Sequence, residues 1–157
     1  MIDAAYAVTA NVISQIGGVI SLGLGMLHCK SSRQKLNVKS STKAELVGAS
    51  NYVPYNIWLL MFLSAQGYVI KDNILYQDNT STILMLKNGK NSCNGNSRHV
   101  NVRYFFVNDR VDKQEVKIEY CPTLQVSADF FTKPLQGHLF RMFRDVIMGY
   151  KPISSLK

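Results

Sequence analysis

The sequence has few cysteines and no long apolar run. Its three cysteines, in 157 residues, form no Cys-x-x-Cys pair, and its three histidines do not complete zinc-finger spacing with them. These absences argue against a disulfide framework and a zinc ribbon, and they favour a reducing, intracellular compartment. The apolar stretch over residues 12–27 is interrupted by Ser14, Gln15 and several glycines. It is shorter than the roughly 20 apolar residues that a membrane span needs, so no membrane partner is expected.

The composition fits a single globular domain that binds a polyanion. Hydrophobic residues make up 46% of the chain and charged residues 18%. The formal net charge is +8 and the isoelectric point is about 9.5. This balance favours nucleic acid as a partner ahead of an anionic membrane surface. The basic residues are dispersed and form no strongly basic amphipathic stretch, so a membrane-surface protein is the least favoured class.

The first half of the chain predicts strands followed by a long helix. Residues 18–30 are typical of antiparallel strands that turn at a pair of glycines. A helix is predicted to begin near Ser41 or Thr42, where the sequence fits a capping box. Pro54 is expected to kink or split this helix, and Gly67 to end it. Trp58, on the same helix, is expected to belong to the core.

The second half of the chain predicts alternating short strands and helices. The expected elements are a strand at 73–78, a helix capped by Thr80 or Ser81, a polar loop at 88–97, a helix at 98–113, a strand at 115–120, a helix opened by Pro122 and closed by Pro134, and an amphipathic helix at 136–149. This order predicts an α/β fold with a mixed sheet. Residues 1–135 are expected to form the domain, and residues 136–157 a C-terminal amphipathic helix and tail packed on it or extending from it.

Four of the ten acidic residues stand apart from the others. Asp3, Glu45, Asp78 and Asp129 have mostly small or apolar neighbours, and each is expected at the end of an element or on a buried face. Two unit charges about 4 Å apart repel by about 4 kcal/mol at an effective dielectric constant near 20. Acids gathered at one point therefore imply bound cations or shared protons. Oxygen ligands suit Mg²⁺ or Mn²⁺, and two such ions can activate a water molecule and stabilise the leaving oxygen of a phosphodiester.

Each of these acids also has a simpler interpretation when it is taken singly. Glu45 could close the capping box, and Asp78 could cap the helix that follows it. Asp3 could be a frayed terminal residue, and Asp129 a solvated helix residue. The residues alone leave both interpretations open.

Four motifs occur in one order along the chain and share one resemblance. They are Lys39-Ser-Ser-Thr-Lys-Ala-Glu45-Leu, Tyr76-Gln-Asp78-Asn79-Thr-Ser, Ser97-Arg-His99-Val-Asn-Val-Arg103-Tyr104 and Ala128-Asp129-Phe-Phe-Thr132-Lys133-Pro134-Leu135. Together they resemble the ribonuclease H domain of copia-type retrotransposon Pol polyproteins. The resemblance implies a ribonuclease H-like α/β fold, with a mixed five-stranded sheet, antiparallel and then parallel, flanked by helices.

The resemblance also implies an activity, cofactors and partners. It implies endonucleolytic hydrolysis of the RNA strand of RNA–DNA hybrids during reverse transcription, with two Mg²⁺ or Mn²⁺ ions held by Asp3, Glu45, Asp78 and Asp129. The partners would be the hybrid and the reverse transcriptase part of the same polyprotein. The location would be cytoplasmic, in virus-like particles, or nuclear. The candidate nucleic-acid-binding residues are Arg98, His99, Arg103 and Lys133.

The chain departs from the family at several positions. About half a dozen residues of the first strand usually precede the first acid, and here only Met1 and Ile2 do, which indicates a slight truncation at the N-terminus. A strand this short is expected to lose ladder bonds and to seat Asp3 poorly. Lys43 also stands where the family commonly has Glu. These departures favour an alternative, an inactive or truncated remnant that retains only nucleic-acid binding. An integrase-like nuclease of the same fold is a further alternative, against which the Thr-Lys-Pro-Leu motif argues.

Overall fold

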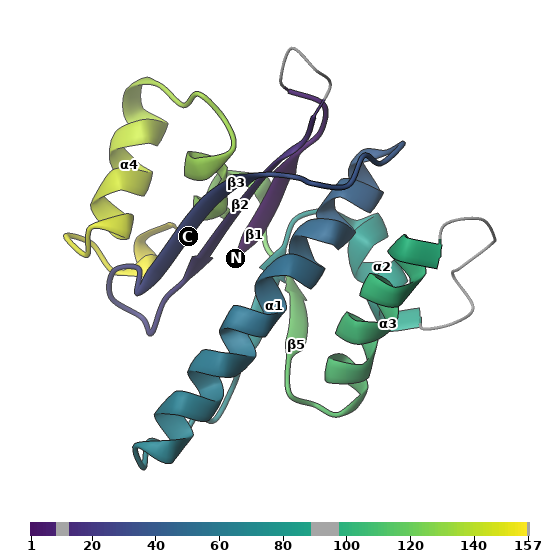
Figure 1. The fold of residues 1–157 in the computed structure, drawn as a ribbon. Helices are drawn as coiled ribbons and strands as arrows, with labels where there is room; N and C mark the ends of the chain where they lie inside the picture. Colours follow the sequence, from purple (N-terminus) through teal and green to yellow (C-terminus); the bar gives the residue numbers. More distant parts are fainter. Residues whose placement is uncertain (9–12, 89–97, 157) are drawn as a thin grey trace.

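The computed structural model describes residues 1–8, 13–88 and 98–156, and the side chains of residues 98–101 lie outside the description. The elements are β1 (Ile2–Ala5), β2 (Gln15–Ile20), β3 (His28–Arg33), α1 (Ser41–Ala65), β4 (Ile74–Gln77), α2 (Thr80–Asn88), α3 (Arg98–Asp112), β5 (Lys117–Tyr120) and α4 (Gly137–Ile147), with short 3-10 turns η2 (Thr123–Gln125), η3 (Ser127–Phe131) and η4 (Ile153–Leu156). Strands β1 to β3 lie between α4 on one side and α1, α2 and α3 on the other (Figure 1). The fold is therefore mixed α/β, as predicted.

The strands form two sheets in the described residues. Strands β1, β2 and β3 make an antiparallel sheet, and β4 pairs with β5 in parallel. The expectation of a single five-stranded sheet is therefore wrong, although all five strands are present. Met1 exchanges two backbone hydrogen bonds with Val19, so alternation along the ladder turns the N–H of Ala4 away from β2. The carboxylate of Glu45 accepts that N–H at 3.0 Å, so this backbone donor of β1 is bonded to α1 and not to a strand.

The short first strand seats its acid firmly. Asp3 lies within β1, opposite Gly17 of β2, and only 3% of its surface is exposed. The expectation that Asp3 is poorly seated is therefore wrong, and so is its interpretation as a frayed terminal residue. A loop containing Gly23 and Gly25, both at positive φ, joins β2 to β3 and confirms the predicted turn.

Helix α1 begins at Ser41, within the predicted range and one residue before Thr42, where the predicted capping box starts. Ser40 is the N-cap, and its hydroxyl accepts the N–H of Lys43 at 3.3 Å. Glu45 makes no capping contact, so the capping-box interpretation is wrong. The helix runs unbroken through Pro54 and is not split there, whereas Gly67, at φ +86°, follows its end as predicted.

The two halves of α1 have different surroundings. The first half is buried against β1, β2 and α3, with Leu46 and Val53 fully enclosed in the main core. The second half projects past the sheet (Figure 1), and Trp58 and Met61 are 65% and 64% exposed. The expectation that Trp58 belongs to the core is therefore wrong. No helix among the described residues is long and apolar enough to cross a membrane.

The cap of α2 differs from the prediction. Asn79 precedes the helix, and its side-chain oxygen accepts the N–H of Thr82 at 3.1 Å. An asparagine in this position satisfies a backbone donor that the first turn leaves free. The expected caps Thr80 and Ser81 are therefore wrong, and Asp78 does not cap the helix either.

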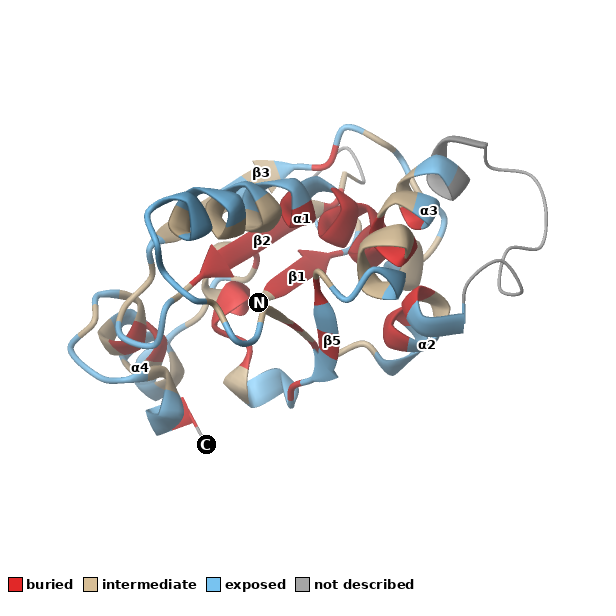
Figure 2. Cartoon of the chain, turned by 90° about the horizontal axis from the view of Figure 1, so that it is seen from below, coloured by how far each residue is buried: buried red, intermediate tan, exposed pale blue. Residues whose placement is uncertain are grey.

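The C-terminal third forms short turns before its last α-helix. The helix expected between Pro122 and Pro134 is two 3-10 turns, η2 and η3, because the chain is extended at Val126 and buries that side chain completely. Tyr120, the last residue of β5, is 56% exposed, whereas Ile118 on the same strand is buried. Helix α4 packs against η3 and η4 through fully buried Phe143. Strands β1 and β2 are buried almost throughout (Figure 2).

Candidate metal centre

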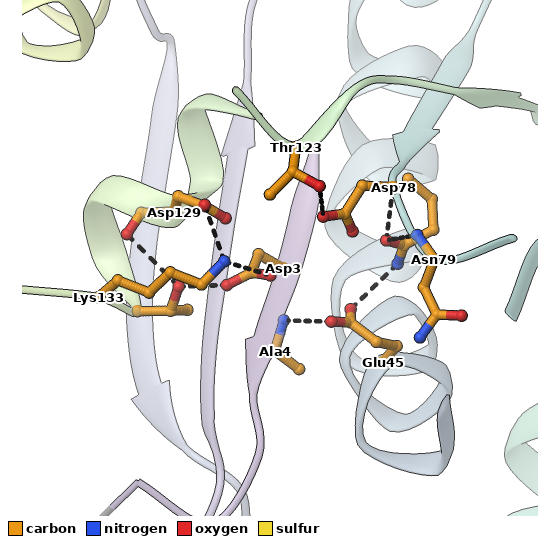
Figure 3. A network of polar contacts seen from close by, with 10 residues as sticks. Asp3, Ala4, Glu45, Asp78, Asn79, Thr123, Asp129 and Lys133 are labelled. Atoms are coloured by element: carbon orange, nitrogen blue, oxygen red, sulfur yellow. Dashed lines mark hydrogen bonds and ion pairs between the residues drawn. The ribbon is translucent and has the colours of Figure 1, made fainter. Parts of the chain in front are cut away.

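Three of the four predicted acids meet between β1, α1 and the end of β4. Asp3, Glu45 and Asp78 each offer a carboxylate oxygen, and these atoms all lie within 4.8 Å of one another (Figure 3). Asp3 and Glu45 are buried, while Asp78 is half-buried. The structure thus places together side chains that lie 75 residues apart along the chain, from Asp3 to Asp78.

Glu45 bridges the two sheets through its carboxylate. One oxygen accepts the backbone N–H of Ala4 at 3.0 Å, and the other accepts the side-chain amide of Gln77 at 3.1 Å. Burial, and after it the neighbouring charge of Asp3, raise the pKa of Glu45 to about 8, although both hydrogen bonds favour the carboxylate. Glu45 is thus held in a fixed orientation and keeps its proton near neutral pH unless a cation compensates its charge.

Gln77 also shapes the turn that carries Asp78. Its side-chain oxygen accepts the backbone N–H of Asp78 at 2.7 Å and that of Asn79 at 3.2 Å. The hydroxyl of Thr123 donates to Asp78 at 2.9 Å and fixes its side chain (Figure 3). Gln77 is almost fully buried, and the sequence analysis did not single it out. Its position directly before the Asp-Asn pair was the available signal.

Asp129 lies beside this group and shares a lysine with Asp3. The ammonium group of Lys133 is 2.8 Å from Asp129 Oδ2 and 3.6 Å from Asp3 Oδ1, and Thr132 donates its hydroxyl to Asp3. Asp129 is 5% exposed, so its interpretation as a solvated helix residue is wrong. Its Oδ1 is buried without a hydrogen-bond partner among the described residues. An orphaned buried carboxylate oxygen is costly unless a cation binds it.

The pKa values of this second pair follow from its surroundings. Burial raises the pKa of Asp129 to about 6, and the charge of Asp3 acts in the same direction, while the hydrogen bond from Lys133 opposes it. Partial burial lowers the pKa of Lys133, but the hydrogen bond to Asp129 and the nearby carboxylates outweigh it and hold the pKa above its ordinary value. Lys133 therefore stays positively charged.

The donor set fits hard divalent cations. All four side chains present carboxylate oxygens, three of them converge, and the fourth keeps one oxygen free. Mg²⁺ and Mn²⁺ prefer such ligands, whereas zinc sites are mostly built from nitrogen and sulfur. Asp3, Glu45 and Asp78 are the residues that would hold one ion, and Asp3 with Asp129 would hold another.

The predicted nucleic-acid-binding residues have different positions. Arg98 and His99 lie in the first turn of α3, and their side chains lie outside the described residues. Arg103 donates to Ser50 at 3.2 Å and also to Asn51, so it ties α3 to α1. Lys133 contacts the acids themselves. The polar loop expected at 88–97 falls, apart from Asn88, outside the described residues.

The approach of η3 to the sheet depends on Gly17. A Cβ atom at this position would lie 2.6 Å from the backbone oxygen of Ala128 and 2.7 Å from Thr132. We expect Gly17→Ala to push the segment carrying Asp129 away from Asp3 and to lower the free energy of unfolding by about 1–3 kcal/mol. Chemical denaturation measures the effect. Gly23→Ala is the comparison variant. Gly23 has φ +119°, so alanine there introduces backbone strain, but its Cβ would meet no atom within 4 Å. Equal losses in the two variants would contradict the steric explanation.

The fold and the site together define an α/β protein with a carboxylate cluster suited to divalent cations. Similar sequences are Pol polyproteins of transposons. The chain is 28% identical over 134 residues to "Retrovirus-related Pol polyprotein from transposon TNT 1-94" of Nicotiana tabacum, which covers 85% of this chain and 10% of that polyprotein. It is 26% identical over 136 residues to the corresponding polyprotein from transposon RE1 of Arabidopsis thaliana, covering 86% of this chain and 9% of the relative.

A yeast relative extends the same pattern. The chain is 29% identical over 142 residues to "Transposon Ty1-JR1 Gag-Pol polyprotein" of Saccharomyces cerevisiae, which covers 89% of this chain and 8% of the polyprotein. The homologues are thus retrotransposon Pol polyproteins of the Ty1/copia type, at modest identity over most of this chain. The chain spans about a tenth of their length. No protein-family model and no solved structure matches it.

Proposed function

We propose that the chain is a ribonuclease H domain of a copia-type retrotransposon Pol polyprotein and hydrolyses the RNA strand of RNA–DNA hybrids. The observation that carries the proposal is the convergence of Asp3, Glu45 and Asp78, with Asp129 beside them. The Pol polyprotein homologues agree with it, because reverse transcription produces such hybrids. The reverse transcriptase part of the same polyprotein is the proposed partner, in cytoplasmic particles or in the nucleus.

The order and direction of the elements support a ribonuclease H-like fold. Three antiparallel strands come first, then a helix, and then two parallel strands separated by α2 and α3. Strand β4 contacts β1 at the boundary between the two sheets. Glu45 connects these two strands, because its carboxylate accepts hydrogen bonds from Ala4 of β1 and from Gln77 of β4. This is the sequence of strand directions, antiparallel and then parallel, that the resemblance implies.

The chain's own residues would hold and orient the reacting groups. Divalent cations at the carboxylates would activate water and stabilise the leaving oxygen of an RNA phosphodiester. The hydrogen bonds from Ala4 and Gln77 fix the direction in which Glu45 points, and Thr123 does the same for Asp78. Such support keeps metal ligands in place, and its loss commonly costs 10–100-fold in affinity or activity. The 2′-hydroxyl group would distinguish the RNA strand from DNA.

A basic groove that is lined in part by α1 supports a nucleic-acid substrate. A cavity of about 480 Å³ lies between β3, α1 and α3, and its basic lining residues are Lys30, Arg33, Lys35 and Arg103. The described residues that line it include no acid. Helix α1 carries both Glu45 and part of the groove lining, including Val47. A nucleic acid long enough to contact both could place a phosphate in this groove.

A charge reversal in the groove tests this contact. We expect Lys35→Glu to weaken binding of an RNA–DNA hybrid about tenfold near 0.1 M salt, and to make the affinity less dependent on salt, because one phosphate contact is lost. Lys71→Glu, at an exposed position outside the groove, makes the same change in net charge and should have a much smaller effect. Fluorescence anisotropy over a salt series measures both. Equal weakening by the two variants would assign the effect to net charge alone.

Cleavage of a labelled hybrid tests the proposed function. We expect the chain with Mg²⁺ or Mn²⁺ to cut the RNA strand alone, and a chelator or Asp78→Asn to abolish the cut. Duplex DNA should remain intact. Cleavage of duplex DNA would instead support the integrase-like alternative. Binding of the hybrid without cleavage by the folded chain would instead support the inactive remnant. The firm seating of Asp3 in β1 favours the active enzyme.

A further inference from the structure

Lys133 places a positive charge between two of the acids. Its ammonium group lies 2.8 Å from Asp129 and 3.6 Å from Asp3, and it comes from the residue four positions after Asp129 (Figure 3). Asp3 and Asp129 are both buried. Asp129 lies outside the group of three converging acids, whose atoms are all within 4.8 Å of one another. The four acids therefore form a three-acid group and a pair that already has a cation, and Asp3 belongs to both.

The remaining oxygen of Asp129 shows that this pair is incompletely satisfied. Lys133 bonds Oδ2, while Oδ1 is buried and has no hydrogen-bond partner among the described residues. An ammonium group offers a single charge on a flexible stem, whereas a divalent ion could bind several carboxylate oxygens at once. Lys133 thus compensates one of the two negative charges of the pair and leaves its coordination capacity unfilled.

We propose that the Lys133 ammonium group occupies the position of the second divalent ion, so that the chain alone binds one ion tightly and a second only weakly. The inference rests on the proposed function, since it concerns the same acids. In the three-acid group, Glu45 and Asp78 have no ammonium or guanidinium partner among the described residues, so a first ion there would displace no cation from them. A second ion between Asp3 and Asp129 has to move Lys133 away from both carboxylates and loses affinity through repulsion by its charge. Lys133 therefore acts as a resident competitor for this position, in place of the phosphate contact expected from the sequence.

Substitutions that separate charge from packing test this competition. Lys133→Met keeps the apolar stem and removes the charge, whereas Lys133→Arg keeps the charge. Mn²⁺ binding is measured by titration calorimetry and by the electron paramagnetic resonance signal of free Mn²⁺, without nucleic acid. We expect one tight ion in the wild-type chain, and a second dissociation constant at least tenfold lower in Lys133→Met. Lys133→Arg should retain the weak second site. Thermal melts establish that each variant is folded.

The outcomes distinguish this inference from the proposed function. An unchanged or weaker second site in a folded Lys133→Met variant would overturn the inference alone, as would a tight second site in Lys133→Arg. Absence of Mn²⁺ binding by the wild-type chain, or tight binding that survives Asp78→Asn, would overturn the proposed function and the inference with it.

Discussion

Replacing Glu45 with glutamine is expected to lower the rate of hybrid cleavage at least about 10³-fold and to leave the chain folded. The carboxylate of Glu45 is one of three that converge, and it is the one held by both Ala4 and Gln77. Glutamine has nearly the same shape but no negative charge to offer a divalent ion. Metal ions contribute several kcal/mol of transition-state stabilisation, and each 1.36 kcal/mol is a factor of ten in rate.

The matched control for this variant is Glu119→Gln. Glu119 is exposed on β5 and lies outside the group of converging carboxylates, so its substitution makes the same change in charge without removing one of them. Single-turnover cleavage of a labelled hybrid, with melting curves for both variants, separates loss of chemistry from loss of fold. Cleavage by Glu45→Gln within about tenfold of the wild-type rate would show that Glu45 holds no essential ion.

The same substitution is expected to stabilise the metal-free chain increasingly as the pH rises. Glu45 has a pKa of about 8 in the folded chain against an ordinary value of 4.5. Between these values the folded state binds more protons than the unfolded state, so the contribution of Glu45 to stability is lost as the pH rises. The slope is at most about 1.4 kcal/mol per pH unit, which gives a few kcal/mol in total.

The difference in the free energy of unfolding between the wild-type chain and Glu45→Gln isolates the contribution of Glu45. The buried amino group of Met1 has its pKa lowered from 8.0 to about 5, chiefly by burial, and it produces the opposite slope over much of the same range. Because both proteins contain Met1, its effect cancels in the comparison. Denaturant unfolding from pH 5 to pH 9 with a chelator present measures the free energies. A constant difference across that range would contradict the assignment of a raised pKa to Glu45.

Added Mg²⁺ is expected to stabilise the wild-type chain more than the Glu45→Gln variant. A ligand that binds only the folded state at 100 times its dissociation constant stabilises it by about 2.7 kcal/mol. The wild-type chain should therefore gain stability from Mg²⁺, most strongly near pH 8 and above, where Glu45 is ionised. Glu45→Gln should gain little at any pH.

The acids could be predicted from the sequence because each belongs to a recognisable local motif. Glu45 follows Ser-Ser-Thr-Lys-Ala, and Asp78 ends an apolar strand, so both positions could be inferred without the fold. The separation of Asp129 from the other three could not be inferred. It depends on the extended backbone at Val126, which divides an expected helix into two 3-10 turns, and on the reach of Lys133 to two carboxylates.

The sheet shows the same limit of local patterns. Alternating residues predict strands, but they do not show whether β1 and β4 pair, nor which group accepts the N–H of Ala4. Glu45 takes it, from a helix that begins 37 residues after Ala4, at Ser41. Likewise, the apolar spacing around Trp58 predicts a helix correctly and its burial wrongly, because the helix is longer than the sheet beneath it (Figure 1).

Anomalous diffraction from a crystal of this chain soaked in Mn²⁺ tests the central claim most directly. The claim is that the converging carboxylates form a divalent-cation site. We predict a strong manganese peak among Asp3, Glu45 and Asp78, with carboxylate oxygens about 2 Å away, and a weaker peak or none between Asp3 and Asp129 while Lys133 is present. Manganese found only on the surface, with the carboxylates uncoordinated at saturating Mn²⁺, would contradict it.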